Sequence, residues 1–137
     1  VRRSRFLLTV VLFGAGAGQA ALADDWTAVA LGTNGIAAAA TAERQAAAMR
    51  GAVEVCRARG GADCGSLLVT GRGQWIVAEM CGRTRILVSA ETYDAARRAA
   101  RDQSIDAELR GEGPVSRCKR VLVIGPAGEQ AQTARGQ

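Results

Sequence analysis

The sequence predicts an α+β domain in which two tandem ββαβ-like repeats form a mainly antiparallel sheet with two helices packed on one face. Two series of elements, starting at Trp26 and Trp75, each run from a hairpin pattern through an alanine-rich helical stretch to a short aliphatic strand. Each series also carries a cysteine, Cys64 or Cys118, shortly before that last strand. Repeats of this length are single supersecondary units that bury their apolar faces against each other. We therefore expect one domain over residues 24–124.

Each repeat opens with a predicted β-hairpin. In the first, apolar runs at 26–31 and 35–40 flank Asn34-Gly35, a pair typical of turns in which both central residues have positive φ. In the second, runs at 75–80 and 85–88 flank Gly82-Arg83.

A helix is predicted after each hairpin, with Thr41 and Ser89 as N-caps and Glu43 and Glu91 in the first turns, where carboxylates favour the helix dipole. The first helix ends at Gly60-Gly61. One of its faces collects apolar residues at spacings of three and four: Ala42, Ala46, Met49, Val53 and Cys56.

The second helix is expected over about 90–104, with Arg97, Arg98 and Arg101 on its outer side. A last strand is expected over 119–124. Residues 125–137 offer nothing to bury and are predicted to be a flexible tail.

The N-terminal residues have the pattern of a secretory signal peptide over residues 1–23. A basic start at 1–5 precedes an apolar stretch at 6–18, and Ala21-Leu22-Ala23 then predicts cleavage between Ala23 and Asp24. The apolar stretch is shorter than the roughly 18–20 residues that cross a bilayer. We expect a periplasmic or extracellular protein with no stable membrane anchor after cleavage.

Charge argues against nucleic acid as a partner. The whole chain carries a formal charge of +5, and loss of Arg2, Arg3 and Arg5 lowers its Lys and Arg from 18 to 15 against 13 acids. Acids are interleaved with the arginines along the remainder, whereas phosphate backbones are bound by concentrated basic faces.

The four cysteines predict two structural disulfides, as expected for a small exported domain. The chain has no histidine and no closely spaced cysteine pair, so we expect no metal, no cofactor and no catalytic cysteine. Four cysteines allow three pairings. We favour Cys56–Cys64, from the end of the first helix to the following strand, and Cys81–Cys118, from the centre of the second repeat to its last strand.

Two other residue types invite a functional interpretation. Most acids fall on predicted helix caps, exposed helix faces or loops, and Glu79 alone interrupts a strand, where a solvent-facing position would explain it. Trp26 and Trp75 occupy matching places at the starts of strands, and we expect them to be core anchors. No catalytic residue is predicted.

Several short motifs resemble an exported bacterial family known as domain of unknown function 4189. They are Trp26-Thr-Ala-Val-Ala, Thr41-Ala-Glu with an alanine-rich helix ending at Cys56, Gly61-Ala-Asp-Cys64, and Leu67-Leu-Val. The resemblance covers about residues 26–124. It implies export, disulfides and a repeat architecture, and it implies no particular activity.

These observations favour a non-catalytic binding or interaction module of the bacterial cell envelope or extracellular space, acting on a protein partner as monomer or dimer. Inhibition of a hydrolase would fit this class. The segment Ile105–Ser116, where the second repeat is longer than the first, is the first candidate for recognition. The alternatives are an enzyme that uses converging carboxylates and a secreted effector.

Overall fold

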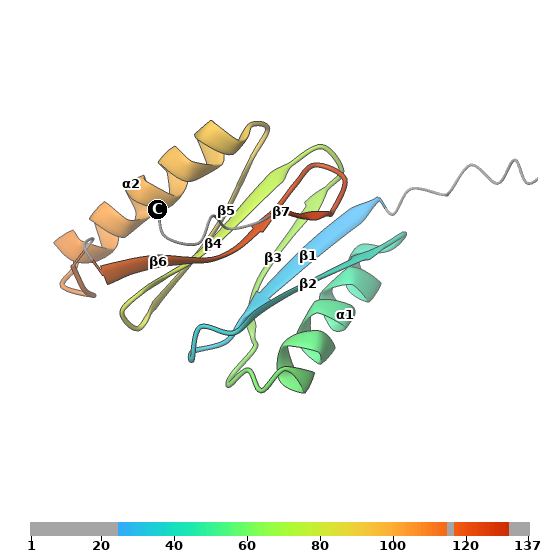
Figure 1. Cartoon of the computed structure of the whole chain (residues 1–137), viewed down its shortest axis with the longest axis horizontal. Coiled ribbons are helices and arrows are strands. Elements are labelled where there is room, and N and C mark those ends of the chain that lie inside the picture. Colours follow the sequence, from blue (N-terminus) through green and yellow to red (C-terminus); the bar gives the residue numbers. More distant parts are fainter. Residues whose placement is uncertain (1–24, 115–116, 132–137) are drawn as a thin grey trace, which may run out of the picture.

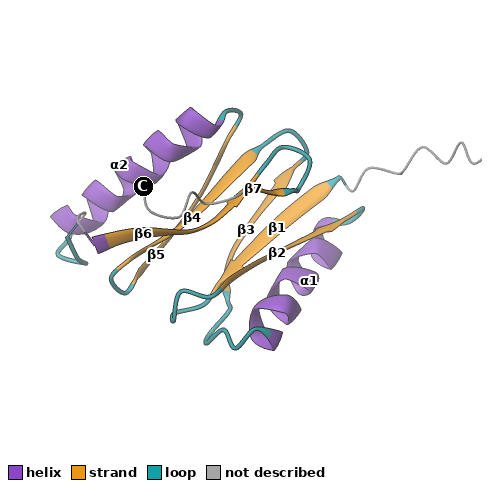
Figure 2. Cartoon of the chain, in the orientation of Figure 1, coloured by secondary structure: helices purple, strands orange, loops and turns teal. Residues whose placement is uncertain are grey.

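The structure, a computed structural model, describes residues 25–114 and 117–131. The predicted signal peptide and its cleavage site lie outside these residues. Figures 1 and 2 show the helices and strands in chain order. They are β1 (Trp26–Leu31), β2 (Ala37–Ala42), α1 (Gln45–Ala58), β3 (Ser66–Gly71), β4 (Trp75–Cys81), β5 (Thr84–Ala90), α2 (Tyr93–Leu109), β6 (Cys118–Ile124) and β7 (Gln130–Ala131).

The predicted α+β class is confirmed, and both halves of the domain have the same order of elements. Strands β2-β1-β3 form one antiparallel sheet, and β5-β4-β6-β7 form the other. In each sheet the first strand of the half lies between the second strand and the strand that follows the helix. The halves therefore share a topology, while duplication of the sequence remains a prediction.

The observed arrangement of layers differs from the prediction, which was a single sheet with both helices on one face. Two sheets pack face to face, and α1 and α2 cover their opposite outer faces (Figure 1). The reason lies in strands that are apolar on both sides: Ala28 and Ala30 of β1 face α1, whereas Val29 and Leu31 face the other sheet. Successive side chains of a strand point to opposite faces, so such strands are buried from both sides.

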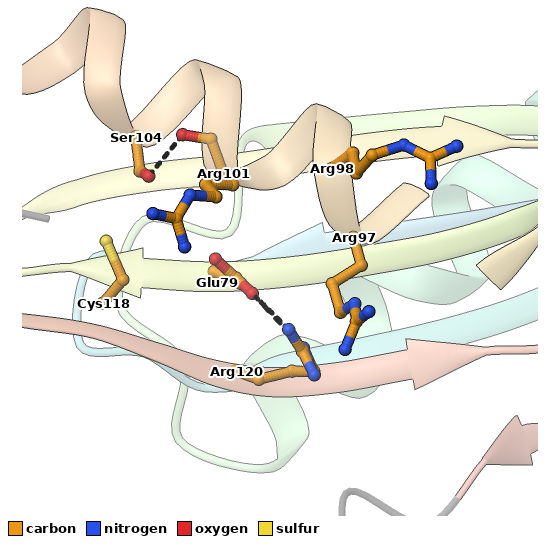
Figure 3. A pocket seen from close by; sticks show the side chains of 7 residues that line it. All are labelled: Glu79, Arg97, Arg98, Arg101, Ser104, Cys118 and Arg120. Atoms are coloured by element: carbon orange, nitrogen blue, oxygen red, sulfur yellow. Dashed lines mark hydrogen bonds and ion pairs between the residues drawn. The ribbon is translucent and has the colours of Figure 1, made fainter. Parts of the chain in front are cut away.

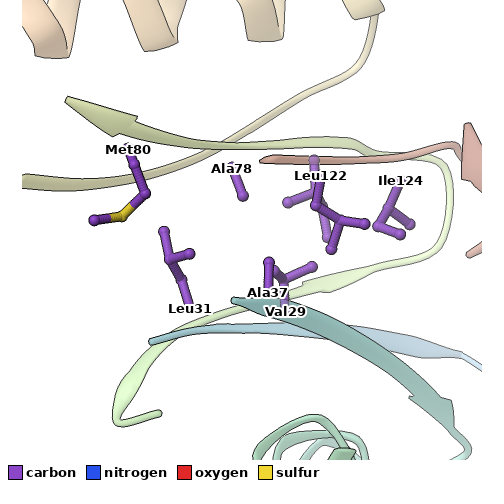
Figure 4. Close-up of a cluster of buried hydrophobic side chains, with 8 residues drawn as sticks. Val29, Leu31, Ala37, Ala78, Met80, Leu122 and Ile124 are labelled. Carbon is purple, nitrogen blue, oxygen red and sulfur yellow. The ribbon is translucent and has the colours of Figure 1, made fainter. Parts of the chain in front are cut away.

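The cluster between the sheets contains the larger aliphatic side chains (Figure 4). Burial of each such side chain stabilises the fold by roughly 1.5–3 kcal/mol. Its members are Val29, Leu31, Ala37, Ile76, Ala78, Met80, Leu122 and Ile124.

The layers beneath the helices are built mainly from alanine, which lets the helices lie close to the sheets. The buried residues of α1 are Ala48, Ala52 and Cys56. A Cβ added at Gly51 would lie only 2.9 Å from the Cβ of Ala40. The predicted core anchors Trp26 and Trp75 are partly buried and pack against these outer clusters, not in the centre of the core.

Both predicted hairpins are present, and the first has a different turn. Among the described residues of that turn, only Gly35 has positive φ, at 81°, so Asn34 is not left-handed. Asn34 instead links two loops: its side chain donates to the Gly60 oxygen at 2.9 Å and accepts from the Ala62 nitrogen at 3.1 Å. In the second hairpin, Gly82 has a φ of 63°.

The predicted N-caps are wrong in both halves by the same displacement. Thr41 and Ser89 are strand residues of β2 and β5. The N-caps are Arg44, which has no side-chain capping bond, and Thr92, whose hydroxyl accepts from the Ala95 nitrogen at 3.1 Å. Serine and threonine are compatible with strands as well as caps, and pairing with β1 or β4 decides between the two.

The prediction of a flexible tail is wrong for residues 125–131. The Gly125 nitrogen donates to the Glu129 oxygen at 2.8 Å, which closes a turn, and β7 then pairs with the end of β6. Ala131 packs against the cluster beneath α2. The short strand satisfies backbone groups that β6 would otherwise leave unpaired at the sheet edge.

No helix within residues 25–114 and 117–131 is both long enough and apolar enough to span a bilayer.

Candidate functional site

A β-bulge in β6 determines which of its side chains face α2. Pairing of β4 with β6 shifts register between Ala78 and Glu79: Ala78 lies opposite Leu122, but Glu79 lies opposite Arg120. Val121 is therefore an extra residue, and it reverses the alternation of side chains along β6. Leu122 faces the central core as a result, whereas Arg120 faces α2 beside Glu79.

Glu79 is a buried carboxylate neutralised by an arginine. Its exposed fraction is 8%, and its Oε1 accepts from Nη2 and Nε of Arg120 at 3.0 and 3.2 Å. Nη1 of Arg120 also donates to the Tyr93 hydroxyl at 2.8 Å. The prediction of a solvent-facing position for Glu79 is thus wrong. A carboxylate beneath a helix needs such partners because burial of an unpaired charge is costly.

An aromatic pair flanks this ion pair. The rings of Tyr93 and Trp75 lie 5.5 Å apart between centroids. The guanidinium carbons of Arg97 and Arg120 lie 6.0 and 5.8 Å from the centre of the Tyr93 ring. Cation–π attraction at these distances is modest. Both arginines contact the Tyr93 ring, and both also line a neighbouring hollow.

This hollow, which we call the arginine pocket, lies between α2 and strands β4 and β6 and has a volume of about 420 Å³ (Figure 3). In Figure 3, Arg97 and Arg101 extend from the helix toward the strands, and Arg98 extends away from Glu79. The lining residues are Glu79, Arg97, Arg98, Arg101, Ser104, Cys118 and Arg120.

The arginine pocket has an excess of positive charge. Glu79 balances Arg120, and Asp94 outside the pocket pairs with Arg97 at 3.3 Å. The guanidinium groups of Arg98 and Arg101 have no ion pair or hydrogen bond with any residue that the structure describes. Two guanidinium groups thus remain available as donors.

Both favoured disulfide pairings are confirmed. Cys56–Cys64 joins the end of α1 to the loop before β3, with 6.1 Å between the Cα atoms. Cys81–Cys118 joins directly opposed residues of β4 and β6 and forms one edge of the arginine pocket.

One group of side chains has the spacing of a metal site. Ligand atoms of Glu79, Cys81 and Cys118 all lie within 4.8 Å of one another. Metal binding by cysteine needs the thiolate, and these two sulfurs are bonded to each other. The donor set therefore does not fit a metal while the disulfide is intact.

The acids of the described residues do not converge in the main pockets. The arginine pocket contains Glu79, a smaller hollow of about 200 Å³ beside β5 contains Asp106, and a groove of about 470 Å³ along α1 contains Glu54. Each of these three pockets contains a single acid, whereas the alternative of a carboxylate enzyme predicts at least two acids in one pocket. The remaining described acids, such as Glu43 and Glu91, are exposed.

Residues 105–114 of the predicted recognition segment Ile105–Ser116 form the end of α2 and the start of the following loop, and Val115 and Ser116 lie outside the described residues. Ile105 and Leu109 are 38% and 81% exposed. Arg110 and Glu112 form a bidentate ion pair at 3.0 and 3.2 Å. Hydrogen bonding from Arg110 lowers the pKa of Glu112 from its ordinary value, and the same bond raises the pKa of Arg110.

Sequence reasoning missed the arginine pocket and assigned Arg97, Arg98 and Arg101 to an outer helix face. The i,i+4 spacing of Arg97 and Arg101 was the available signal, because residues so spaced lie on one side of a helix. What the sequence does not reveal is that this side overlies Glu79.

The fold and site define a four-layer α/β/β/α domain with a basic pocket on one outer face. Comparison of the chain with protein-family models, with curated proteins and with solved structures finds no match. The resemblance to domain of unknown function 4189 accordingly stays a hypothesis.

Proposed function

We propose that the protein is a non-catalytic binding module of the bacterial cell envelope or extracellular space, which recognises an anionic group on its partner through the arginine pocket. The observation that carries this proposal is the pair of guanidinium groups, Arg98 and Arg101, that have no partner among the described residues. Guanidinium groups are forked donors suited to oxyanions.

The surroundings of the pocket support a binding role because they hold it in a fixed shape. The Cys81–Cys118 disulfide fixes β4 to β6 at one end, and the Arg120 hydrogen bond to Tyr93 fixes the strand to α2. Recognition is tighter when the binding groups are ordered before the partner arrives. Inhibition of a hydrolase is one form that such recognition would take.

Site-specific photo-crosslinking in cells that make the full chain tests the proposal. A photoreactive residue at Asp102 samples the α2 face, and one at Glu54 samples the α1 face. Both replace exposed acids on outer helices. We expect a discrete protein adduct from position 102 and none from position 54.

Charge substitutions distinguish the pocket from general attraction. Arg98→Gln with Arg101→Gln should remove most of the adduct. Arg50→Gln with Arg57→Gln makes the same change in net charge on α1, where both arginines are exposed, and should leave the adduct unchanged. Equal adducts from both faces, or equal loss in the two double variants, would contradict the proposal.

A further inference from the structure

We infer that the arginine pocket binds a phosphate monoester. This inference rests on the proposed function and names the chemical class of the anionic group. Three properties of the pocket lead to it: its charge, the arrangement of its donors and its volume.

The charge of the pocket corresponds to a dianion. After the pairs Arg120–Glu79 and Arg97–Asp94 are counted, two lining arginines keep an unpaired charge: Arg101, which extends toward the strands, and Arg98, which extends away from Glu79 (Figure 3). A phosphate monoester carries about −1.5 to −2 charges near neutral pH. A single carboxylate would balance only one of the two arginines.

The donors come from two directions. Arg97 and Arg101 extend from α2 toward the strands, and Arg120 lies on β6 across the hollow (Figure 3). Nε, Nη1 and Nη2 of Arg120 already donate to Glu79 or Tyr93, which leaves one further N–H on each Nη atom. A planar carboxylate accepts one bidentate pair, whereas the three terminal oxygens of a phosphate monoester accept from several guanidinium groups at once. Donors placed on both sides of the hollow therefore favour the tetrahedral group.

The arginines of α2 that line the pocket are close neighbours on the helix surface. Arg101 lies four residues after Arg97 and three after Arg98, so these positive charges are neighbours on the helix surface. Like charges at such spacings repel one another, and a bound anion would offset that repulsion.

The volume leaves room for the organic part of the ligand. About 420 Å³ falls within the range of small-molecule pockets and far exceeds the space that one phosphate group fills. The Ser104 hydroxyl lines this space; it donates to the Arg101 main-chain oxygen at 2.7 Å and keeps its own oxygen available as an acceptor. A hydroxyl on the ester is the group that it would accept from.

The experiment is a titration of the oxidised full chain, followed by amide NMR, with glycerol 3-phosphate and, at equal ionic strength, with succinate. We expect glycerol 3-phosphate to shift signals of α2 and β6 and to bind at least fivefold more tightly than succinate. Arg101→Gln should weaken binding at least tenfold, whereas Arg50→Gln on α1 should change it less than twofold. Both replacements are at exposed helix positions, and unchanged circular dichroism would establish that each variant folds.

Three results would overturn the inference: no shift in the pocket, equal affinity for succinate, or equal weakening by Arg101→Gln and Arg50→Gln. Co-sedimentation with vesicles of phosphatidylcholine and phosphatidic acid, without binding of glycerol 3-phosphate, would also overturn it in favour of a membrane ligand. If the unsubstituted pocket binds glycerol 3-phosphate but position 102 gives no protein adduct, the protein partner alone would be refuted. A pocket-dependent adduct without phosphate binding would refute the ligand class alone.

Discussion

Arg85 of β5 donates a hydrogen bond from Nη1 to the main-chain oxygen of Asp63, 2.8 Å away. The same nitrogen donates to the main-chain oxygen of Leu31 at 3.1 Å. One guanidinium of the second half therefore satisfies carbonyls at the end of β1 and in the loop before β3 in the first half. The ion pair with the Asp63 carboxylate, at 3.6 Å, is a further contact.

Arg85→Gln should lower the free energy of unfolding by about 2 kcal/mol, because two carbonyls lose a charged donor. Asp63→Asn should cost less than about 0.5 kcal/mol, since it removes only a pair whose carboxylate is 69% exposed. Asparagine also tolerates the positive φ of 48° at this position. Urea denaturation measures both values, and equal losses would show that the ion pair is the important contact.

The two disulfides should contribute unequally to stability. They close loops with sequence separations of 8 and 37 residues. Loss of chain entropy predicts a cost of about 3 kcal/mol for Cys56→Ala with Cys64→Ala and about 4 kcal/mol for Cys81→Ala with Cys118→Ala. Denaturation of the two double variants measures the difference. A larger loss from the short loop would contradict the entropic origin.

Removal of one partner of the Glu79–Arg120 pair should cost more than removal of both. Arg120→Met leaves a buried carboxylate without its donors and should destabilise the fold by about 3 kcal/mol. Glu79→Leu together with Arg120→Met should recover part of that loss. A double-mutant cycle by denaturation measures the coupling, and additive effects would mean that the two side chains do not interact.

Gly61→Ala should weaken the first disulfide. An added Cβ would lie 2.5 Å from both sulfurs of Cys56–Cys64 and 2.7 Å from the Cys56 oxygen. Relief of this overlap should cost about 1–3 kcal/mol. Gly71→Ala is the control, because its Cβ would approach only the Asp25 oxygen, at 4.0 Å. Thiol titration and denaturation compare the variants; equal stability would contradict the predicted overlap.

Arg110→Gln should raise the pKa of Glu112 toward its ordinary value. In the native protein the hydrogen bond from Arg110 lowers that pKa. A lowered folded-state pKa stabilises the fold above the unfolded-state pKa, and the contribution is lost as pH falls through the folded value. NMR titration of the Glu112 side chain in both proteins measures the change. An identical pKa would mean that the ion pair does not form in solution.

Much of the fold could be predicted because its signals are local. The glycines of the turns, the alanine spacing of the helices and the short separation of Cys56 and Cys64 all act within a few residues. The end of α1 at Gly60 was predicted for the same reason, whereas α2 was expected to end near residue 104 and continues to Leu109. Both helices end in the same way: Gly60 and Gly111 have φ of 88° and 78°, and the next residue donates back to a carbonyl five residues earlier.

The layer arrangement and the site could not be predicted in this way. Whether two hairpins join one sheet or two depends on contacts between distant strands, for which strands with two apolar faces were the only sign. The Glu79–Arg120 pair spans 41 residues and depends on the bulge at Val121, which no residue type marks. A regular register would have directed Arg120 toward the central core.

The inner face of each sheet has only the opposing sheet as its cover. A ribosome delivers the first half of the chain before the second, so Val29 and Leu31 have no apolar surface to meet until β4 and β6 have been made. Burial of the cluster between the sheets therefore requires both halves of the chain. The Cys56–Cys64 bond can form early from the first half alone, whereas the Cys81–Cys118 bond has to await β6.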